Sequence, residues 1–245
     1  VPHHLHEEFY INILQSGKHL LGEKPFGINL TANTHIMEVI QQNPSLFVRC
    51  ASEFPFFPGA MKMMQWMKER RFENVIEIEA GFWHSSDLNP LKQINWKRRV
   101  ETNGEYGGMG DLGMHVVHLP FRAGWFPVDV FASLKKVFLE RPDSTGKMVP
   151  CDTWENAILS CKTHNHSDEF PMTLSMKRVS PGEGNTWFIR ILGTRFSAEF
   201  STKNPKEIRY MEYTPGGKQT WQREDLAHVS AYPVITGGIF EFGFS

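Results

Sequence analysis

The hydrophobic positions of this 245-residue chain follow a helical period near the N-terminus and a two-residue period later on. Apolar residues at helical spacing precede Gly17, a residue type that often follows the last turn of a helix. The apolar run after Gly17 predicts a short buried parallel strand whose carboxyl end presents Lys24. Residues 29–43 then predict a capped helix and residues 46–51 a strand, so this part of the chain has the pattern of α/β repeats.

Strict alternation begins after residue 75. Ile76, Ile78, Ala80 and Phe82 alternate with glutamates, which predicts a strand with one wet face. The same period and Gly/Pro-rich turns predict further strands at residues 128–138, 154–161, 172–179, 187–192, 195–200 and 208–213. Consecutive strands with helices only before them predict a large, mostly antiparallel open sheet. We therefore expect two domains, residues 1–54 and 55–245.

Composition narrows the class of protein further. The chain is 40% hydrophobic and 22% charged, with a formal net charge of −1. Balanced charge without a basic cluster argues against nucleic-acid binding, and no apolar run approaches the ~20 residues that a membrane-spanning helix needs. The 3 cysteines lack the C-x-x-C spacing of a metal or redox site, which favours reduced thiols in a cytoplasmic protein.

The glycine-rich stretch from Gly107 to His115 carries the strongest chemical signal. Asp111 and His115 are spaced i, i+4 behind the glycines, so a helix continuing to Arg122 would place them with His118 on one polar face. An Asp and two His differ from the Lys/Glu pairs of an ordinary solvated helix face, although such a face is the alternative interpretation. This spacing favours an acid/base unit.

Three motifs together resemble the Gfo/Idh/MocA family of NAD(P)-dependent oxidoreductases. They are Val1-Pro2-His3-His4-Leu5-His6, then Gly17-Lys18-His19 with Glu23-Lys24-Pro25, then Gly107-Gly108 with Asp111, Gly113 and His115. The resemblance covers the first half of the chain. It implies a Rossmann domain, of which residues 1–54 would be the C-terminal remnant, followed by a substrate and oligomerisation domain with a large sheet.

The resemblance also implies a reaction, a cofactor and site residues. Family members transfer a hydride between NAD or NADP and a sugar, an inositol or a related polyol. The positions matching the family's catalytic residues are Lys24, Asp111 and His115. Those expected on the cofactor side are Pro2, His3, His6, Glu23, Lys24 and Pro25, and those expected to contact substrate are Trp96, Arg98 and His118, with no metal ligand.

These residue types suit the chemistry. Oxidising an alcohol by hydride transfer requires a base for the hydroxyl proton and a positive group that stabilises the developing alkoxide. His115 fits the base because its ordinary pKa of about 6.5 is close to neutral pH. Lys24 would polarise the oxygen, and Asp111 would orient and balance the pair. The Lys24–Pro25 bond is expected to be cis, since X-Pro peptides adopt cis at low cost.

Some features depart from the family pattern. No G-x-G-x-x-G opens a βαβ unit in residues 1–60, and the chain starts at Val1. We therefore expect an internal fragment that is inactive alone, with the C-terminal residues 237–245 ending earlier than in similar proteins. His118 also stands where the family commonly has an Asp, which leaves the substrate, the reaction direction and the choice of NAD or NADP undetermined.

Two other classes remain open at this stage. Asp111, His115 and His118 have the types and spacing for a metal-dependent hydrolase or lyase, although this explains neither Lys24 nor the glycines. His3-His4-x-His6 is a weaker metal candidate. A non-catalytic dimerising module is the other alternative. We expect the outer sheet face to be rich in Phe, Met and Val and to pack against a second chain, giving a homodimer or tetramer.

Overall fold

The N-terminal part of the computed structural model is an α/β layer, and residues 1–165 and 168–226 are described. It contains α1 (His6–Gln15), β1 (Leu20–Glu23), α2 (Leu30–Gln42) and β2 (Val48–Ala51). β1 and β2 pair in parallel, and Tyr10, Leu14 and Ile36 pack beneath them. Gly17 has a positive φ of 74° after α1, and Asn29 caps α2 by accepting from the Ala32 N–H at 2.9 Å. The predicted α/β repeats are confirmed.

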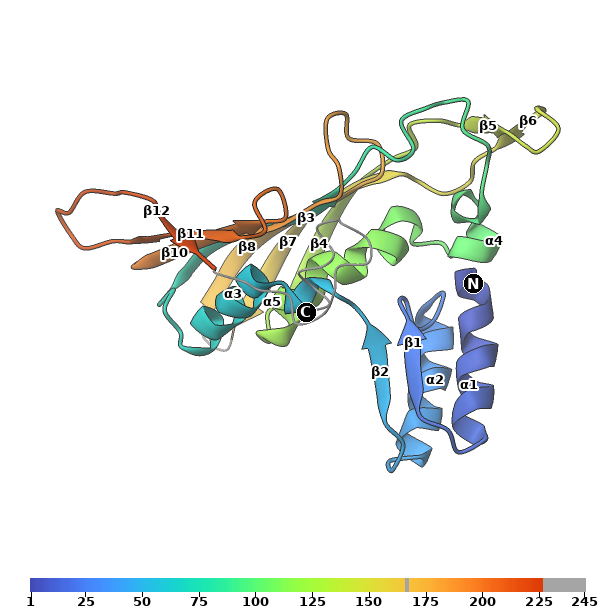
Figure 1. Cartoon of the computed structure of the whole chain (residues 1–245), viewed down its shortest axis with the longest axis horizontal. Coiled ribbons are helices and arrows are strands. Elements are labelled where there is room, and N and C mark those ends of the chain that lie inside the picture. Colours follow the sequence, from blue (N-terminus) through green and yellow to red (C-terminus); the bar gives the residue numbers. More distant parts are fainter. Residues whose placement is uncertain (166–167, 227–245) are drawn as a thin grey trace.

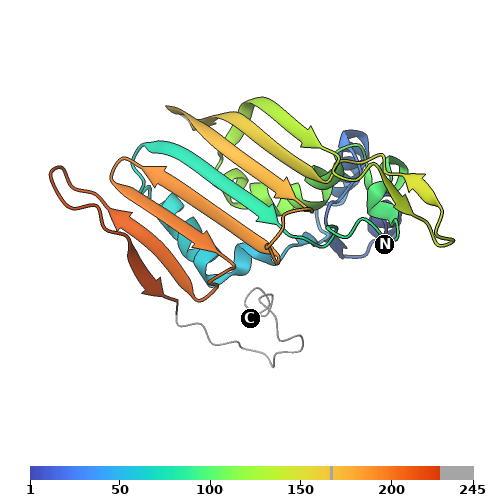
Figure 2. The ribbon, with the colours of Figure 1, turned by 90° about the horizontal axis from the view of Figure 1, so that it is seen from above.

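The larger layer is an eight-stranded sheet. Its bounds are β3 (Val75–Trp83), β4 (Phe126–Lys135), β7 (Asn156–Asn165), β8 (Asp168–Lys177), β9 (Thr186–Gly193), β10 (Phe196–Ser201), β11 (Glu207–Glu212) and β12 (Gln222–Asp225). The order is β12-β11-β10-β9-β3-β8-β7-β4, with only β3 and β8 parallel. The large, mostly antiparallel sheet is thus confirmed (Figure 2).

Two helices cover one face of the sheet and leave the other open (Figure 1). They are α3 (Pro58–Lys68) and α5 (Met114–Arg122). Trp66, Ile78 and Trp187 are buried between the helices and the strands, and each such side chain contributes roughly 1.5–3 kcal/mol to stability. At Gly59 of α3 a Cβ atom would lie 2.0 Å from the Phe200 ring, so the helix approaches β10 only because this residue is glycine.

Several smaller features were not expected from the sequence. A two-stranded hairpin of β5 (Glu140–Pro142) and β6 (Met148–Pro150) follows β4, and the short helix α4 (Val100–Asn103) precedes the glycine-rich stretch. A β-bulge between Val75 and Glu77 turns Ile76 outward, where it is 52% exposed, while Ile78 and the following alternate residues point inward. The alternation predicted for this strand therefore starts at Ile78 rather than Ile76.

The open face of the sheet differs from the predicted apolar surface. Register and alternation place charged and small polar side chains there, among them Glu79, Ser175, Arg190, Glu199 and Arg209, together with the aromatic side chains of Trp83 and Phe188. The expectation that this face is rich in Phe, Met and Val was wrong, because most residues of these types occupy inward positions and the open face is mixed. Exposed apolar side chains gather instead on the edge strand β4: Phe126, Val128, Val130, Phe131 and Leu134.

The helices of the described residues do not include one that is long and apolar enough to cross a membrane.

Candidate active site

Asp111 lies in a π-helical turn formed by Met109–Gly113, and α5 begins only at Met114. The prediction of one continuous α-helix from Asp111 was therefore wrong at its N-terminal end. The wider turn carries an extra residue, so Asp111 and His115 are not related by an ordinary i, i+4 step. Gly107, with a φ of 50°, precedes the turn, and a Cβ atom there would lie 3.0 Å from the Trp154 ring.

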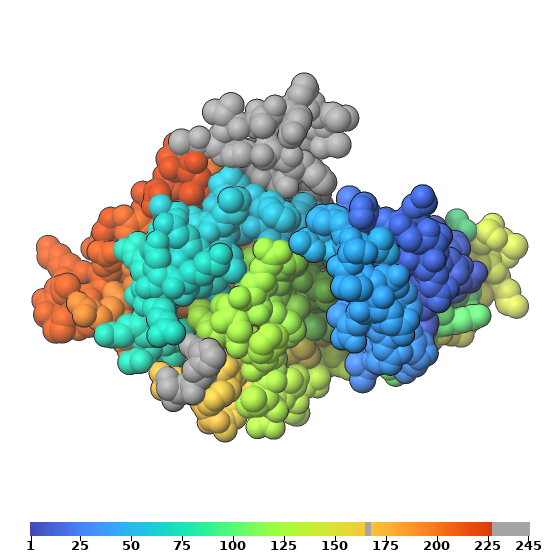
Figure 3. Space-filling model, turned by 90° about the horizontal axis from the view of Figure 1, so that it is seen from below, coloured from blue at the N-terminus to red at the C-terminus, as the bar shows by residue number. Residues whose placement is uncertain are grey.

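Lys24 joins the two layers of the molecule at Asp111. It stands at the carboxyl end of β1, and its bond to Pro25 is cis, as predicted. Its Nζ donates to the Asp111 backbone oxygen at 2.8 Å and to Oδ1 at 3.0 Å. Residues 87 positions apart in sequence, expected to share a site, are thus in direct contact. In Figure 3 the N-terminal layer, in blue, lies beside the green segment that contains α5.

Two further cations hold the same carboxylate. Lys97 Nζ lies 3.2 Å from Asp111 Oδ1 and 3.3 Å from Oδ2, and the buried Arg178 guanidinium pairs with Oδ2. The sequence analysis missed Arg178. In the sequence, the only sign of a role for Arg178 is its position directly after β8. Because β8 runs parallel to β3, the two strands end side by side, and the His84 N–H bonds the Lys177 backbone oxygen there.

Burial makes both lysines unusually acidic. It lowers the pKa of Lys24 from 10.5 to about 8, with Arg178 adding to the effect and Glu23 and Glu53 opposing it. Burial, with the charges of Arg178 and Lys24, likewise lowers the pKa of Lys97 to about 7. Perturbed groups of this kind concentrate at functional sites. The pair can therefore present positive charge to an oxyanion near neutral pH, and either lysine can exchange a proton there.

His115 is buried beside this cluster and is 5% exposed. Its ring packs against Phe54 and Phe82, with centroids 4.7 and 5.5 Å away, and Trp187 Nε1 donates to its backbone oxygen at 2.9 Å. Within the described residues its Nδ1 has no hydrogen-bond partner. Burial, then the positive charge of Lys24, lowers its pKa well below the usual range. His115 is therefore a neutral imidazole near pH 7, and the same burial makes it a weaker base than a free histidine.

The residues expected on the cofactor side gather around the end of β1. His6 Nδ1 donates to the Pro25 backbone oxygen at 2.6 Å, and its Nε2 is buried without a partner in the described part of the chain. His3 lies edge-on to Trp96 at 4.6 Å, and Tyr10 donates to the Glu23 backbone oxygen at 2.9 Å. His6 Nε2 is thus a buried acceptor that could bind a hydroxyl group. Pro2, half-buried, precedes these residues.

Arg98 does not reach the site as expected for a substrate contact. Its side chain is 1% exposed and forms an ion pair with Asp87. Lys92 also binds Asp87, at 2.7 Å, and Arg141 donates to its backbone oxygen at 2.6 Å. Arg98 thus helps to hold Asp87 in place, and Arg178 Nη1 lies 3.8 Å from Oδ2 of the same Asp87.

The other two expected substrate contacts are placed differently. Trp96 is half-buried beside His3, with the Lys97 ammonium group 5.4 Å from its ring. His118 Nδ1 lies 3.5 Å from Ser52 Oγ, and burial lowers its pKa to about 4. Trp96 thus adjoins Lys97, which binds Asp111, and His118 lies on the helix that carries His115.

The metal-site alternative has no geometric support. Among residues 1–165 and 168–226, no group of three or more His, Cys, Asp or Glu side chains could hold an ion. Both carboxylate oxygens of Asp111 are engaged by cations. The three cysteines are free thiols.

The chain aligns in sequence with known oxidoreductases. It is 24% identical over 211 residues to an uncharacterized oxidoreductase of Synechocystis sp., covering 84% of this chain and 54% of that protein. It is 22% identical over 146 residues to levoglucosan dehydrogenase of Pseudarthrobacter phenanthrenivorans, covering 59% of this chain and 37% of that enzyme. The chain thus spans about half, or less, of these relatives. No protein-family model matches it.

Solved structures show the same fold over nearly the whole chain. An oxidoreductase domain protein from Kribbella flavida superposes with a TM-score of 0.87 at 18% identity, covering 99% of this chain and 66% of that one. Levoglucosan dehydrogenase in complex with NADH and levoglucosan gives 0.85 at 19% identity, covering 100% and 66%. An inositol dehydrogenase homolog from Azotobacter vinelandii with NAD+ gives 0.81 at 17% identity, covering 99% and 62%.

These neighbours are Gfo/Idh/MocA-type oxidoreductases, and the sequence relatives are oxidoreductases too, so the resemblance predicted from the three motifs is confirmed. The chain has the fold of the sheet domain of this class together with part of an adjoining α/β layer.

Proposed function

We propose that the chain is the substrate-side part of an NAD(P)-dependent oxidoreductase acting on CH–OH groups of a sugar, an inositol or a related polyol. Residues 1–54 are the remnant of the dinucleotide-binding domain, and residues 55–245 form the substrate and oligomerisation domain. The observation that carries the proposal is the contact of Lys24, at the end of β1, with Asp111 of the sheet domain. Among the relatives, enzymes described as acting on levoglucosan and glucose 6-phosphate support a sugar substrate.

Three residues carry the reaction in this proposal. Neutral His115 accepts the hydroxyl proton of the substrate, because burial and nearby positive charge keep its imidazole unprotonated. Lys24 donates to the same oxygen and stabilises its developing negative charge. Asp111 fixes the Lys24 ammonium group, and Trp96 and His118 lie on the substrate side. Bound NAD(P) would supply the hydride acceptor.

On the cofactor side, Pro2, His3, His6, Glu23, Lys24 and Pro25 would hold the nicotinamide end of the dinucleotide. The pyrophosphate is normally held by backbone N–H groups of a glycine loop at a helix N-terminus, and residues 1–60 contain no such loop. We therefore expect the 245-residue polypeptide alone to bind dinucleotide weakly and to have no turnover. The free thiols favour a cytoplasmic location.

The test separates binding from chemistry. The chain is titrated with NADH and NADPH while nicotinamide fluorescence is followed, and then again after fusion behind a complete βαβ Rossmann segment. We expect saturable binding and polyol oxidation only in the fusion, abolished by Lys24→Ala or His115→Ala and retained by Lys18→Ala, which changes an exposed lysine. Saturable micromolar binding by the chain alone would refute the glycine-loop argument. Full activity of the fused Lys24→Ala variant would refute the catalytic assignment.

A further inference from the structure

The charges around Asp111 do not balance. Its side chain is 2% exposed and binds three cations, which are Lys24 at 3.0 Å, Lys97 at 3.2 Å and the Arg178 guanidinium. Away from water, like charges repel one another strongly, and one carboxylate cannot neutralise three cations. The cluster therefore carries an excess of positive charge.

The neighbouring carboxylate does not remove this excess. Asp87 lies 3.8 Å from Arg178, but it is already paired with Arg98 and, at 2.7 Å, with Lys92. In the ion pairs of the described residues, five cations thus share the two carboxylates of Asp87 and Asp111. Unmatched charge of one sign attracts ligands of the opposite sign. The cluster should therefore attract an anion.

The other titratable groups near the two lysines leave the excess in place. Glu23 and Glu53 act on Lys24, but burial raises the pKa of Glu53, which makes it a weaker counter-charge than an exposed glutamate. Burial also raises the pKa of the nearby Cys50 thiol, to about 11, so this group is neutral. Beyond Asp111, the charges that act on Lys97 are all positive: Arg178, Lys24 and Lys92. The histidines that face the cluster are neutral near pH 7, because burial lowers the pKa of each: His3, His84 and His115.

Lys97 and Lys24 are the members of the cluster that an outside group can reach. Their side chains are 31% and 18% exposed, whereas that of Arg178 is 7% exposed. Lys97 belongs to the turn Trp96–Arg98 and Lys24 directly follows β1, so the two reach Asp111 from distant parts of the chain. Because both Nζ atoms contact the same Asp111 Oδ1, at 3.0 and 3.2 Å, they are separated by no more than about 6 Å.

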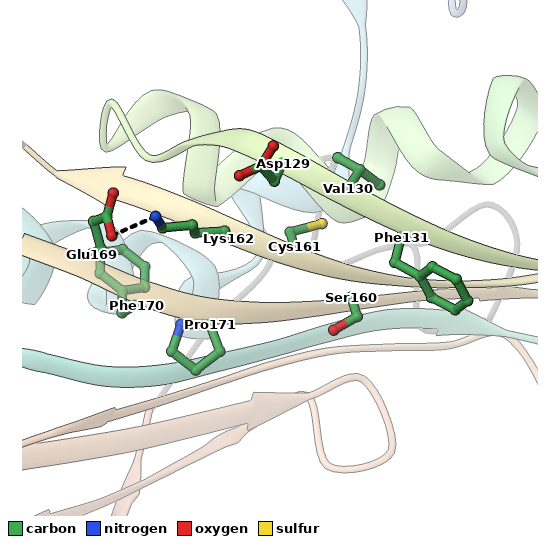
Figure 4. Close-up of a pocket in the computed structure, with 9 residues that line it drawn as sticks. All are labelled: Asp129, Val130, Phe131, Ser160, Cys161, Lys162, Glu169, Phe170 and Pro171. Carbon is green, nitrogen blue, oxygen red and sulfur yellow. Dashed lines mark ion pairs between the residues drawn. The ribbon is translucent and has the colours of Figure 1, made fainter.

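An open depression elsewhere in the structure provides a comparison. It has a volume of about 630 Å³ and lies over β4, β7 and β8 (Figure 4). The residues that line it include Lys162, which pairs with Glu169 at 2.6 Å, and a further carboxylate, Asp129. Positive charge is matched there, so the excess at Asp111 is not a general property of exposed surfaces in this protein.

We propose that the substrate of this site carries a negatively charged group, a carboxylate or a phosphate, which binds Lys97 while the reacting CH–OH group lies at Lys24. The inference rests on the proposed function and narrows its substrate class to acidic sugars or polyols. Because the two ammonium groups are within about 6 Å of each other, the charged group lies only a few bonds from the reacting carbon. Hydrogen bonds between ionised groups are roughly twice as strong as those between neutral ones, so this charge should dominate the choice of substrate.

Calorimetric titration of the chain with three matched sugars tests the proposal. Glucose, glucuronate and glucose 6-phosphate share a ring and differ in the group at one end, so the last two distinguish a carboxylate from a phosphate. At pH 6.5 we expect at least one of the charged sugars to bind about tenfold more tightly than glucose, because a hydrogen bond to a charged group is the stronger one. Equal affinities for the three sugars, or no binding of either charged sugar, would overturn the proposal.

Substitutions of Lys97 assign the effect to its charge. Lys97→Met should weaken binding of the preferred charged sugar about tenfold at pH 6.5 and leave glucose unaffected, whereas Lys97→Arg should restore the binding. Lys18→Met, which changes an exposed lysine, is the matched control. An undiminished affinity of Lys97→Met for the charged sugar would refute the assignment.

The pH dependence of binding gives a second measurement. Burial, with the charges of Arg178 and Lys24, lowers the pKa of Lys97 to about 7, so its ammonium group loses its proton between pH 6.5 and 8.5. Binding of the charged sugar should weaken over this range. An arginine keeps its charge, so Lys97→Arg should lose less affinity than the unaltered chain. Equal losses in the two proteins would contradict a charge-based role for Lys97.

Failure of this inference is distinguishable from failure of the proposed function. If the fusion with a Rossmann segment oxidises neutral polyols as fast as their acids, the proposed function stands and the inference of an acidic substrate is overturned. If the chain binds a charged sugar through Lys97 but the fusion oxidises no sugar or polyol, the anion site stands and the oxidoreductase function is overturned.

Discussion

Acid should destabilise this protein steeply because four histidines are held neutral. Burial is the main cause for each: it lowers the pKa of His3 and His84 from 6.5 to about 3, that of His118 to about 4, and that of His115 well below 6.5. Below pH 6.5 the unfolded chain takes up protons on these side chains and the folded chain does not. The contribution of these histidines to stability is therefore complete above pH 6.5 and is lost with decreasing pH, toward the folded-state values near 3 to 4.

The expected size follows from the shifts. One pH unit below 6.5, each histidine that stays neutral costs about 1.4 kcal/mol, so four cost up to about 6 kcal/mol at pH 5.5. Burial raises the pKa of Glu53, so this carboxyl group stabilises the folded state as the pH falls. It is one group and offsets only part of the loss caused by the four histidines. Domains of this kind are stable by about 5–15 kcal/mol, so the loss should bring the protein near unfolding.

Urea unfolding followed by tryptophan fluorescence at pH 7.5, 6.5 and 5.5 measures the effect. His84→Gln should reduce the loss between pH 7.5 and 5.5 by about 1 kcal/mol, because it removes one proton-binding site of the unfolded chain. His164→Gln, which changes an exposed histidine, serves as the control. A free energy of unfolding that differs by less than 1 kcal/mol between the two pH values would refute the reasoning.

Three further substitutions test the packing and charge arguments. Asp111→Asn should lower the free energy of unfolding by about 3–5 kcal/mol, because it leaves Lys24, Lys97 and Arg178 without their buried carboxylate; a loss below 1 kcal/mol in urea titration would contradict the cluster. Gly59→Ala should cost about 1–3 kcal/mol, since its Cβ would overlap the enclosed Phe200 ring, and an unchanged melting temperature would contradict this close approach. Gly113→Ala is the matched control: the atoms nearest its Cβ belong to the Met109 side chain, which can move aside, so calorimetry should show the smaller drop.

The sequence predicted the fold well where a hydrophobic pattern extends over many residues, and it did not predict features that depend on contacts between distant residues. The α/β repeats and the large sheet followed from helical and alternating patterns that span many residues. The bulge at Val75 and the π-helical turn at Met109–Gly113 were not predicted. Each depends on a single extra residue, which hardly changes the hydrophobic pattern around it. The motifs brought Lys24 and Asp111 together correctly. They could not predict Arg178, because the site acquires it only through the parallel pairing of β3 with β8.

The open face of the sheet is a second feature that the sequence analysis did not predict. The apolar content of the strands did not predict which surface is apolar, because the position of each residue along its strand, odd or even, decides which face it occupies. Arg98 likewise carries a charge typical of a binding residue, yet its neighbour Asp87, 11 positions away, turns it inward.

The position of β3 determines the order in which the sheet can assemble. β7–β8 and β9–β10–β11 are local hairpins, but β3 separates β8 from β9 and pairs with both. Because β3 meets these partners only roughly a hundred residues later in the chain, closing that loop is the slow, non-local event of folding. During synthesis β3 therefore emerges long before β8 and β9. Its apolar residues Ile78, Ala80 and Phe82 stay exposed to contact with other chains until both hairpins have formed. The centre of the sheet, rather than its edges, is therefore the last part in which the strands pair.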